Sequence, residues 1–497
     1  MSRVCKSRGL PAVATLVTLT AGCAVGPNFK RPAAPDVDDY TAAPVSATVA
    51  SADVAGGEAQ RFSRGGDLSA DWWTLFHSQP LNDLIERSLA HNPDLKAAQA
   101  ALAAARETVL AQRGAYYPSV SGNFSASRQR QAGTISPTPS SNIFLYNLFT
   151  PDVSVSYTPD VFGLNRRTVE SLQAEAQGLR FQMIATYNTL TSNVVVAAIQ
   201  EASLRTQIAA TRQLIDLSSS VTETVRYQFA HGYASGLDVA AQEAQLAQIA
   251  ATLPPLLKQE AQQRDLLAVL GGQFPSQAPA ETFELASLQL PQELPLSLPS
   301  ELVAQRPDVR QAEANLHAAS ARIGIAIANR LPNITLSADT GSTALTVNQL
   351  FTSGTGFWSL GAAATAPLFE GGTLLHQERA AKAAYDQAAE QYRSAVLTAF
   401  QNVADTLAAL EQDAAGLKAA AAAAAAAKVT LDLAQRQWQD GYASYLALLS
   451  AEQADRQAQI NLVQAQANRY ADTAALFQAL GGGWWHDAAL AKHAHDE

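Results

Sequence analysis

The chain has 497 residues, enough for a large core or several domains, and 34 basic against 44 acidic residues give it a formal net charge of −10. An acidic surface repels polyphosphate, so composition argues against a nucleic-acid partner. The hydrophobic share of 47% is ordinary, which does not exclude a membrane β-barrel, because barrel strands alternate lipid-facing with lumen-facing residues.

Residues 1–22 are typical of an export signal. A basic start (Arg3, Lys6 and Arg8) is followed by an apolar stretch from Leu10 to Ala21, too short for a spanning helix. The stretch ends at Ala21-Gly22-Cys23, where small residues precede a cysteine as in a lipoprotein signal. We therefore expect residues 1–22 to be removed and Cys23 to carry lipid. The alternative is an incidental cysteine after an ordinary signal.

The two cysteines exclude an internal disulfide, because Cys5 leaves with the signal and Cys23 then stands alone. Without the three basic residues of the signal, the mature chain carries 31 basic against 44 acidic residues. No later run approaches the roughly 20 apolar residues of a transmembrane helix. We therefore expect an exported protein in which any membrane span is made of β-strands.

The remaining sequence repeats itself. Pro93-Asp94-Leu95 recurs as Pro307-Asp308-Val309, Gly232-Tyr233-Ala234-Ser235 as Gly441-Tyr442-Ala443-Ser444, and Leu270-Gly271-Gly272 as Leu480-Gly481-Gly482. These landmarks keep an offset of roughly 210 residues, which indicates a duplicated unit.

Each copy begins with a predicted helix of about 25 residues, starting at Pro93 or Pro307. After two short alternating segments comes a very long helical stretch, 165–230 in the first copy and 373–440 in the second. At about 1.5 Å per residue such a helix spans on the order of 100 Å. It turns at Gly232 or Gly441 and returns as a second helix ending in Leu-Gly-Gly. A hairpin of this length cannot bury itself and needs neighbouring helices.

The alternating segments predict strands of roughly ten residues, the length that crosses a bilayer when tilted. Residues 119–127 place serine and asparagine at odd positions, and Val120, Gly122, Phe124 and Ala126 between them. Val153, Val155 and Tyr157 alternate with polar residues in the second segment. The third segment (333–339) alternates in the same way, and the fourth (357–367) places Trp358 and Leu360 on one face. A pair of soluble hairpins is the alternative interpretation of the strands alone.

The polar face of these strands is uniformly small and hydrophilic, as a water-filled lumen requires. Lipid forbids open sheet edges, and a barrel needs at least about eight strands, so two chains giving eight or three giving twelve must combine.

From these patterns we expect a signal (1–22), an N-terminal segment (23–78) and a first repeat (79–272). A linker (273–300), a second repeat (301–483) and a tail (484–497) follow. The strands are expected at 119–130, 147–159, 333–341 and 356–367, and the helical hairpins at 165–270 and 373–480. The proline-rich stretch 274–299 is typical of a surface linker.

With these stretches in place, the sequence resembles the TolC family of outer-membrane efflux proteins, in its lipoprotein branch serving resistance-nodulation-division pumps. The resemblance is carried in order by residues 22–32, 71–76, 89–95, 306–313, 440–446 and 480–483. It implies a homotrimer with a twelve-stranded β-barrel in the outer membrane, continued by a long helical barrel across the periplasm. The implied partners are a periplasmic adaptor, an inner-membrane transporter and outer-membrane lipid, and the implied function is passive export of small molecules.

The resemblance also assigns residues to two surfaces. The adaptor would dock on the helix turns His231, Gly232, Tyr233, Ala234, Ser235 and Asp440, Gly441, Tyr442, Ala443, Ser444. Some relatives line the closed aperture with acidic residues shortly after the second turn, where this chain has Ala447 and Ser450. Asp238 holds the equivalent place after the first turn. The gate is therefore expected to be weakly charged, or built from Tyr445 and Leu446.

Other activities have little support in the sequence. Catalytic, cofactor-binding and metal sites are not expected, since the histidines are scattered, and His486, His493 and His495 belong to a tail expected to be solvated. A periplasmic coiled-coil adaptor is the alternative function, but it would carry one helical hairpin between soluble β domains. An exported enzyme is the third possibility, and no set of catalytic residues supports it.

Overall fold

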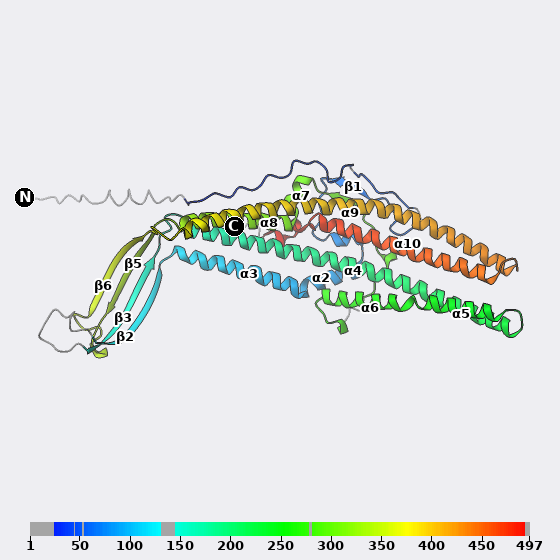
Figure 1. Cartoon of the computed structure of the whole chain (residues 1–497), viewed down its shortest axis with the longest axis horizontal. Helices are drawn as coiled ribbons and strands as arrows, with labels where there is room; N and C mark the ends of the chain where they lie inside the picture. The colour runs from blue at the N-terminus through cyan, green and yellow to red at the C-terminus, as the bar shows by residue number, and fades with distance from the viewer. Residues whose placement is uncertain (1–23, 44, 52–53, 131–144, 278–280, 493–497) are drawn as a thin grey trace, which may run out of the picture. The chain divides into compact units, whose positions relative to one another are not determined.

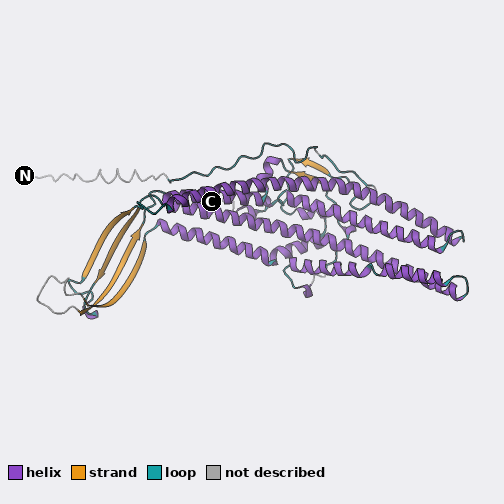
Figure 2. Cartoon of the chain, in the orientation of Figure 1, coloured by secondary structure: helices purple, strands orange, loops and turns teal. Residues whose placement is uncertain are grey.

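The computed structural model describes residues 24–43, 45–51, 54–130, 145–277 and 281–492. Within these residues the chain is mainly helical, with one four-stranded and one two-stranded sheet (Figures 1 and 2). It divides into two compact units. Unit 1 combines residues 1–31, 102–179 and 312–392, and unit 2 combines residues 32–101, 180–311 and 393–497.

The sheet of unit 1 is antiparallel, with strand order β2-β3-β5-β6 (orange in Figure 2). The strands are β2 (Ser119–Arg130), β3 (Leu145–Tyr157), β5 (Asn333–Ser342) and β6 (Gly356–Thr365). The ends of these strands differ from the segments expected from alternation by at most two residues. Each repeat supplies one hairpin, and β3 pairs with β5 to join the two.

Four helices run from one unit into the other. They are α3 (Pro93–Arg113), α4 (Leu164–Ala230), α8 (Pro307–Ala328) and α9 (Thr373–Gln439). Both α4 and α9 have 67 residues, so the duplication preserves the length of the long helix. In unit 1, α3 packs on α4 through Val109, Val169 and Ala176. Asp160 caps α4 by accepting from the backbone N–H groups of Asn165 (2.9 Å) and Arg166 (2.8 Å).

The helix α9 corrects one expectation about membrane segments. By length and composition alone, this helix could cross a membrane, since an 18-residue window of it reaches a mean hydropathy of 1.3. Only 22% of that window is buried. The unbroken alanine run 419–427 lies in this helix. Alanine counts as apolar on a hydropathy scale, and it is also the strongest helix former. The signal therefore carries little weight.

An aromatic core holds unit 2 together. It joins a short 3₁₀ turn, η2 (Trp72–Phe76), to helix α10 (Tyr445–Ala479). The Trp72 ring lies 5.3 Å from that of Phe477, and the Phe76 ring 6.3 Å from that of Tyr470. All four side chains are almost completely buried. Helix α2 (Gln79–His91) buries Leu81, Leu84 and Ile85.

The proline-rich stretch between the repeats is not a surface linker from Phe283 onward. Its strand β4 (Glu293–Leu296) pairs in parallel with β1 (Arg61–Arg64), and Leu294 is fully buried. The Tyr470 hydroxyl donates to the Leu288 carbonyl at 3.0 Å. Leucines at intervals along the stretch therefore pack into unit 2, whereas residues 273–277 at its start are exposed.

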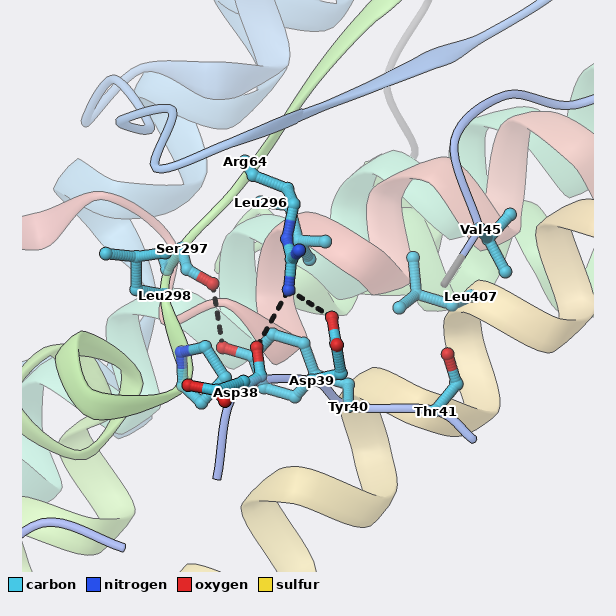
Figure 3. Close-up of a pocket in the computed structure, with 11 residues that line it drawn as sticks. Asp38, Asp39, Tyr40, Thr41, Val45, Arg64, Leu296, Ser297, Leu298 and Leu407 are labelled. Carbon is cyan, nitrogen blue, oxygen red and sulfur yellow. Dashed lines mark hydrogen bonds and ion pairs between the residues drawn. The ribbon is translucent and has the colours of Figure 1, made fainter. Parts of the chain in front are cut away.

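Residues 38–41, near the N-terminus of the described chain, lie against residues 296–298 of the stretch between the repeats (Figure 3). The Tyr40 hydroxyl donates to the Ser297 carbonyl at 2.9 Å, and the Arg64 guanidinium bonds both the Asp38 carbonyl (2.8 Å) and the Asp39 carboxylate. Burial, reinforced by the nearby charge of Glu301, raises the pKa of Tyr40 above its usual value. The cavity among these residues is small, at about 30 Å³.

The returning helix of the first repeat is divided, contrary to the expectation of a single helix. It consists of α5 (Gly236–Ala250) and α6 (Leu253–Leu270), with Ala251 and Thr252 between them. Pro254 and Pro255 explain the break, because proline lacks an amide hydrogen and its ring clashes with the carbonyl four residues earlier. The counterpart in the second repeat, α10, runs for 35 residues without interruption.

Short elements complete the chain. Unit 2 also contains α7 (Pro299–Gln305), the turns η4 (Pro275–Gln277), η5 (Leu285–Ser287) and η7 (Trp484–His486), and α11 (Ala488–Lys492). Unit 1 also contains the turns η3 (Gly114–Tyr116) and η6 (Val347–Gln349). The Arg180 guanidinium donates to the Leu490 carbonyl at 2.6 Å and lies 5.7 Å from the Trp484 ring centre. These contacts hold the start of the C-terminal tail on unit 2.

Candidate functional site

The four-stranded sheet has two chemically different faces. Residues paired across neighbouring strands share a face, and the pairs Val120–Val155, Val155–Ala338 and Ala338–Leu360 run across all four strands. The alternate pairs Ser121–Ser154 and Ser154–Asp339, with Ser359 opposite Asp339, define the other face. The period-2 alternation thus produces one continuous apolar face and one continuous polar face.

On the polar face, short side chains bond one another across the strands. The hydroxyl groups of Ser121 and Ser154 lie 2.7 Å apart, and the Asn123 amide donates to the Asp152 carboxylate at 3.1 Å. The Ser359 hydroxyl donates to the Asp339 carboxylate at 3.1 Å. Small hydrogen-bonded groups leave the adjoining space open to water.

On the apolar face, large side chains have no partner layer within the described residues. Trp358 and Leu360 are each 75% exposed, and Val120 and Phe124 are also largely exposed. The edge strands of the sheet are β2 and β6. A soluble sheet would bury this face against a second layer, so the sheet requires lipid on this face and further strands at both edges.

The two helix turns in unit 2 have the same backbone geometry. Gly232 (φ +79°) follows α4 and Gly441 (φ +81°) follows α9. The Tyr233 N–H donates to the Gln228 carbonyl at 2.8 Å, and the Tyr442 N–H donates to the Gln437 carbonyl at 2.8 Å. This bond across six residues, together with a left-handed glycine, is the Schellman ending of a helix. Glycine is needed at these two positions because a side chain resists positive φ.

Each turn presents aromatic side chains to solvent. Tyr233 is 84% exposed and Tyr442 is 87% exposed, and Leu237 and Leu446 are also largely exposed. His231 folds back on its own helix, with its Nδ1 2.8 Å from the Tyr227 carbonyl oxygen. The large apolar side chains of both turns are therefore exposed and available for contact with another molecule.

A groove of about 430 Å³, which we call the tip groove, is lined by residues of both turns. Tyr233, Ala234 and Asp238 line it from the first repeat, and Ser444, Leu446 and Ser450 from the second. Three of the expected docking residues and three of the expected gate residues thus line one groove, whereas the others, among them His231, Gly232, Ser235 and residues 440–443, do not line it. Sequence reasoning missed the glutamines that line this groove, because polar residues on a helix carry no pattern that marks a groove: Gln228, Gln242, Gln245 and Gln453.

The residue that follows each turn differs between the repeats. Ser235 and Asp238 form a capping box, in which the Ser235 hydroxyl accepts from the Asp238 N–H and the Asp238 carboxylate accepts from the Ser235 N–H (2.8 Å). The Ser235 N–H and hydroxyl hold the pKa of Asp238 below its usual value. In the second repeat Ser444 caps in the same way, but Ala447 stands where Asp238 stands in the first.

Several expected site residues lie elsewhere. Ala447 does not line the tip groove, and Tyr445 contributes its backbone to the first turn of α10. Cys23 lies outside the described residues, as do His493 and His495. His486 is not a free side chain in a solvated tail, because its Nε2 pairs with the Asp67 carboxylate at 2.5 Å, while the Trp485 indole donates to Asp67 at 2.9 Å. Among the described residues no group of three potential metal ligands occurs.

A two-faced sheet that needs lipid and further strands, combined with helices of 67 residues ending in exposed turns, defines a protomer of an outer-membrane channel. The model of the outer membrane efflux protein family matches residues 84–273 and 298–482, one segment in each repeat. The chain belongs to this family. TolC-family channels are trimers in which a β-barrel continues into a helical barrel, so the expected fold class is confirmed.

Curated relatives and a solved structure agree with this assignment. The chain is 30% identical over 497 residues to the toluene efflux pump outer membrane protein TtgC of Pseudomonas putida, covering 98% of each. It is 30% identical over 424 residues to the pyoverdine export outer membrane protein OpmQ of Pseudomonas aeruginosa, covering 84% of this chain and 88% of OpmQ. The Neisseria gonorrhoeae MtrE outer membrane channel, solved in its open state, matches with a TM-score of 0.77 and 26% identity over 93% of this chain and 98% of MtrE.

The expected function and location are therefore confirmed at the level of the family. The chain is the outer-membrane component of an efflux pump, with a large periplasmic portion. Members of the family are channels and not enzymes.

Proposed function

We propose that three copies of this chain form a passive duct that exports small molecules, with no catalytic step of its own. The duct would receive its cargo from a periplasmic adaptor and an inner-membrane transporter of the resistance-nodulation-division class. The observation that carries this proposal is the sheet of unit 1, which has a polar face, an apolar face and two edges to satisfy.

The trimer follows from the edges of that sheet. In hydrocarbon every unpaired backbone group costs several kcal/mol, so β2 of one copy must pair with β6 of the next until the sheet closes. Three copies of four strands give a barrel of about twelve, within the range observed for membrane barrels. The polar face with Ser121, Ser154 and Asp339 would then line the lumen, and the face with Trp358 and Leu360 would meet lipid.

The adaptor would dock at the turns 231–235 and 440–444. The exposed Tyr233 and Tyr442 supply large contact area at low entropic cost, which is typical of interface anchors. The tip groove continues into a larger groove of about 840 Å³ along α4, α5, α6 and α10, and Gln245, Ser450 and Gln453 line both. A helical partner with small and polar residues fits a groove of this kind.

The aperture would be closed by residues of the same region: Asp238, Tyr445, Leu446, Ala447 and Ser450. Only Asp238 among them is acidic, and its carboxylate is already engaged by Ser235. A gate built from these residues would close by packing of Leu446 and its neighbours, with a weak electrostatic barrier.

The N-terminal anchor would be a lipid on Cys23, added after removal of residues 1–22. The export signal and the small residues before Cys23 support this proposal. The exported substrate is not assigned, because relatives of equal identity are named for toluene and for pyoverdine. Substrate selection is expected to reside in the inner-membrane transporter.

Native mass spectrometry of the detergent-extracted protein tests the assembly. We expect a species of three times the mature mass, each copy carrying acyl chains, and a conducting channel in planar bilayers. A monomer without conductance would overturn the trimeric duct. Labelling with palmitate tests the anchor separately, since wild type should incorporate it and Cys23→Ser should not.

Docking at the turns is tested by Gly441→Trp. A bulky side chain at positive φ should distort the turn while leaving trimers in the outer membrane, so drug export should be lost although the channel remains. Gly416→Trp is the matched control, because this glycine lies within α9 with open space around it. Normal export by Gly441→Trp trimers would show that the adaptor binds elsewhere.

A further inference from the structure

The first described residues of the chain are bound in a seat on unit 1, which we define as Gly163, Arg167, Glu170, Glu313, His317 and Gly324. Arg167 of α4 is its centre, with a side chain only 4% exposed. Its guanidinium donates to the Val25 carbonyl (3.0 Å), the Gly26 carbonyl (3.2 Å) and the Asn28 side-chain oxygen (2.8 Å). A buried fork with three acceptors in one segment recognises a particular backbone path.

Glycines on both sides allow this close approach. A Cβ on Gly163 (φ +82°) would lie 2.6 Å from the Ala24 Cβ, and a Cβ on Gly26 (φ +93°) would lie 2.5 Å from the Gly324 Cα. A Cβ on Gly324 would lie 2.8 Å from the Cγ of Arg167. The backbones of the segment, α4 and α8 therefore meet where no side chain fits.

The far end of the segment is held by α8. Phe29 stacks on His317 with ring centres 4.3 Å apart, and the Nε2 of His317 lies 3.0 Å from a Glu170 oxygen. Glu170 also accepts from Arg167 at 2.7 Å, so it links the two ends of the seat. Arg31 pairs with Glu313 at 3.1 Å. Because α4 belongs to the first repeat and α8 to the second, the segment fastens the two repeats together.

The seat lies at the turn that joins the four-stranded sheet to α4. The Val25 N–H donates to the Phe162 carbonyl at 3.1 Å, and Phe162 lies in the short turn between the end of β3 at Tyr157 and the start of α4 at Leu164. Ala24 also lies at this turn, since a Cβ on Gly163 would come within 2.6 Å of the Ala24 Cβ. The described chain therefore enters the seat at Ala24, beside the turn that joins β3 to α4.

We propose that this seat aims the N-terminal lipid: Arg167 is a positioning residue that delivers acyl chains on residue 23 to the bilayer beside the base of β3. The lipid itself rests on the function proposed above. Without the seat, the next strong contacts of the chain are at Asp38–Tyr40, which leaves a tether that reaches about 50 Å. With the seat, the effective concentration of the lipid next to the sheet is far higher.

A nitroxide attached at Lys30→Cys tests the seat without any lipid. The label is placed on the mature chain with Cys23→Ser, exported by an ordinary signal, so that the new thiol is unique. Arg167→Met and the milder Asn28→Ala should each speed the motion of the label by roughly fivefold. A segment released from the seat moves on the nanosecond timescale that the label reports. Arg322→Met is the control, since it breaks the Arg322–Glu175 pair between the same helices at 2.8 Å without touching the segment. Equal label motion in all four proteins would overturn the seat.

The rate of trimer formation tests whether the seat acts through the lipid. In the lipidated chain Arg167→Met should slow trimer formation by about tenfold, the loss expected for bonds of a charged group. In the chain with Cys23→Ser the same substitution should have no further effect, because two changes in one mechanism are not additive. Equal slowing in both backgrounds would reduce Arg167 to a structural residue and overturn the aiming role. If wild type incorporates no palmitate, the anchor and its aiming both fail, while the nitroxide result still decides the seat.

Discussion

The two repeats of the chain share a plan and differ in detail, and three of the differences can be tested. Each supplies a strand hairpin, a helix of 67 residues and a Schellman turn. They differ in the returning helix, which is divided into α5 and α6 in the first repeat and continuous as α10 in the second. They also differ after the turn, at Asp238 and Ala447, and within the long helix, where Asp413 of α9 stands at the place of Leu204 of α4. Duplication thus preserved the long helix and its turn, whereas the segment after the turn diverged.

Charges on the apolar face of the four-stranded sheet should have the largest effect on trimer formation, and the effect should be the same in both repeats. Val155→Arg in the first repeat and Ala338→Arg in the second place a charge on the apolar face, where each costs about 2–4 kcal/mol near the bilayer midplane. Both should prevent trimer formation to a similar extent, measured as heat-resistant trimer on gels. Ser154→Arg and Ser337→Arg, on the polar face, are the controls and should assemble. Equal tolerance of all four would contradict the two-faced barrel.

The returning helices should respond oppositely to proline. Val463→Pro introduces into α10 a proline at the place that Pro254 holds in the first repeat, and should cost about 3 kcal/mol or more in stability. Pro254→Ala, in the first turn of α6, should cost less than about 1 kcal/mol. Chemical unfolding of the purified protein measures both. A Val463→Pro protein as stable as wild type would mean that α10 needs no continuity.

The buried acid of α9 should make stability depend on pH. Burial, followed by the hydrogen bond and charge of Asp472, raises the pKa of Asp413 to about 7, against the lowering effect of Arg469. Folding therefore favours the protonated carboxyl, and the stability it contributes is present below pH 4 and lost as pH rises through about 7.

Asp413→Asn tests this dependence. Because the side chain is only partly buried, we expect the variant to be more stable than wild type by about 1–2 kcal/mol at pH 8 and no more stable below pH 4. Thermal unfolding at the two pH values measures the difference. Asp432→Asn, an exposed partner of Lys428 on the same helix, is the control and should show no such change. A pH-independent difference for Asp413→Asn would contradict the assignment.

The residue after each turn should give the smallest effect on stability. Asp238→Ala removes half of a capping box and should cost about 0.5–1 kcal/mol, whereas Ala447→Asp should gain a similar amount. In planar bilayers Ala447→Asp should also increase cation selectivity and block by divalent cations, and Ala447→Asn should not. Unchanged conductance and selectivity in confirmed Ala447→Asp trimers would place the constriction elsewhere, with Tyr445 and Leu446 the next residues to test.

Much of the fold could be predicted because its signals are local. The alternation in 119–127 and 333–339 specifies strands, and the recurrence of Gly-Tyr-Ala-Ser places the turns at the ends of both long helices. The break between α5 and α6 was also predictable from Pro254 and Pro255. The expectation of one continuous helix in each repeat was wrong because it followed the duplication and overlooked this local signal.

The site was predicted less completely. The docking and gate residues of the two repeats were expected from resemblance, and the groove that brings six of them together depends on how α4, α5 and α10 pack. The glutamines of that groove carry no pattern that separates them from other polar residues on a helix. The seat of the N-terminal segment left no signal either, since Arg167 and Gly324 look like ordinary helix residues.

The sequence alone therefore determined the duplication, the strands with their two faces, the long helices and the turns, because each depends on residues close together in the chain. Only the tertiary structure decided the parallel pairing of β1 with β4, the burial of the stretch between the repeats, the pairing of His486 with Asp67, and the contacts of Arg167 with residues 25–28. These features join segments more than a hundred residues apart. Their partners are selected by packing and by the need to satisfy buried polar groups, which no local pattern records.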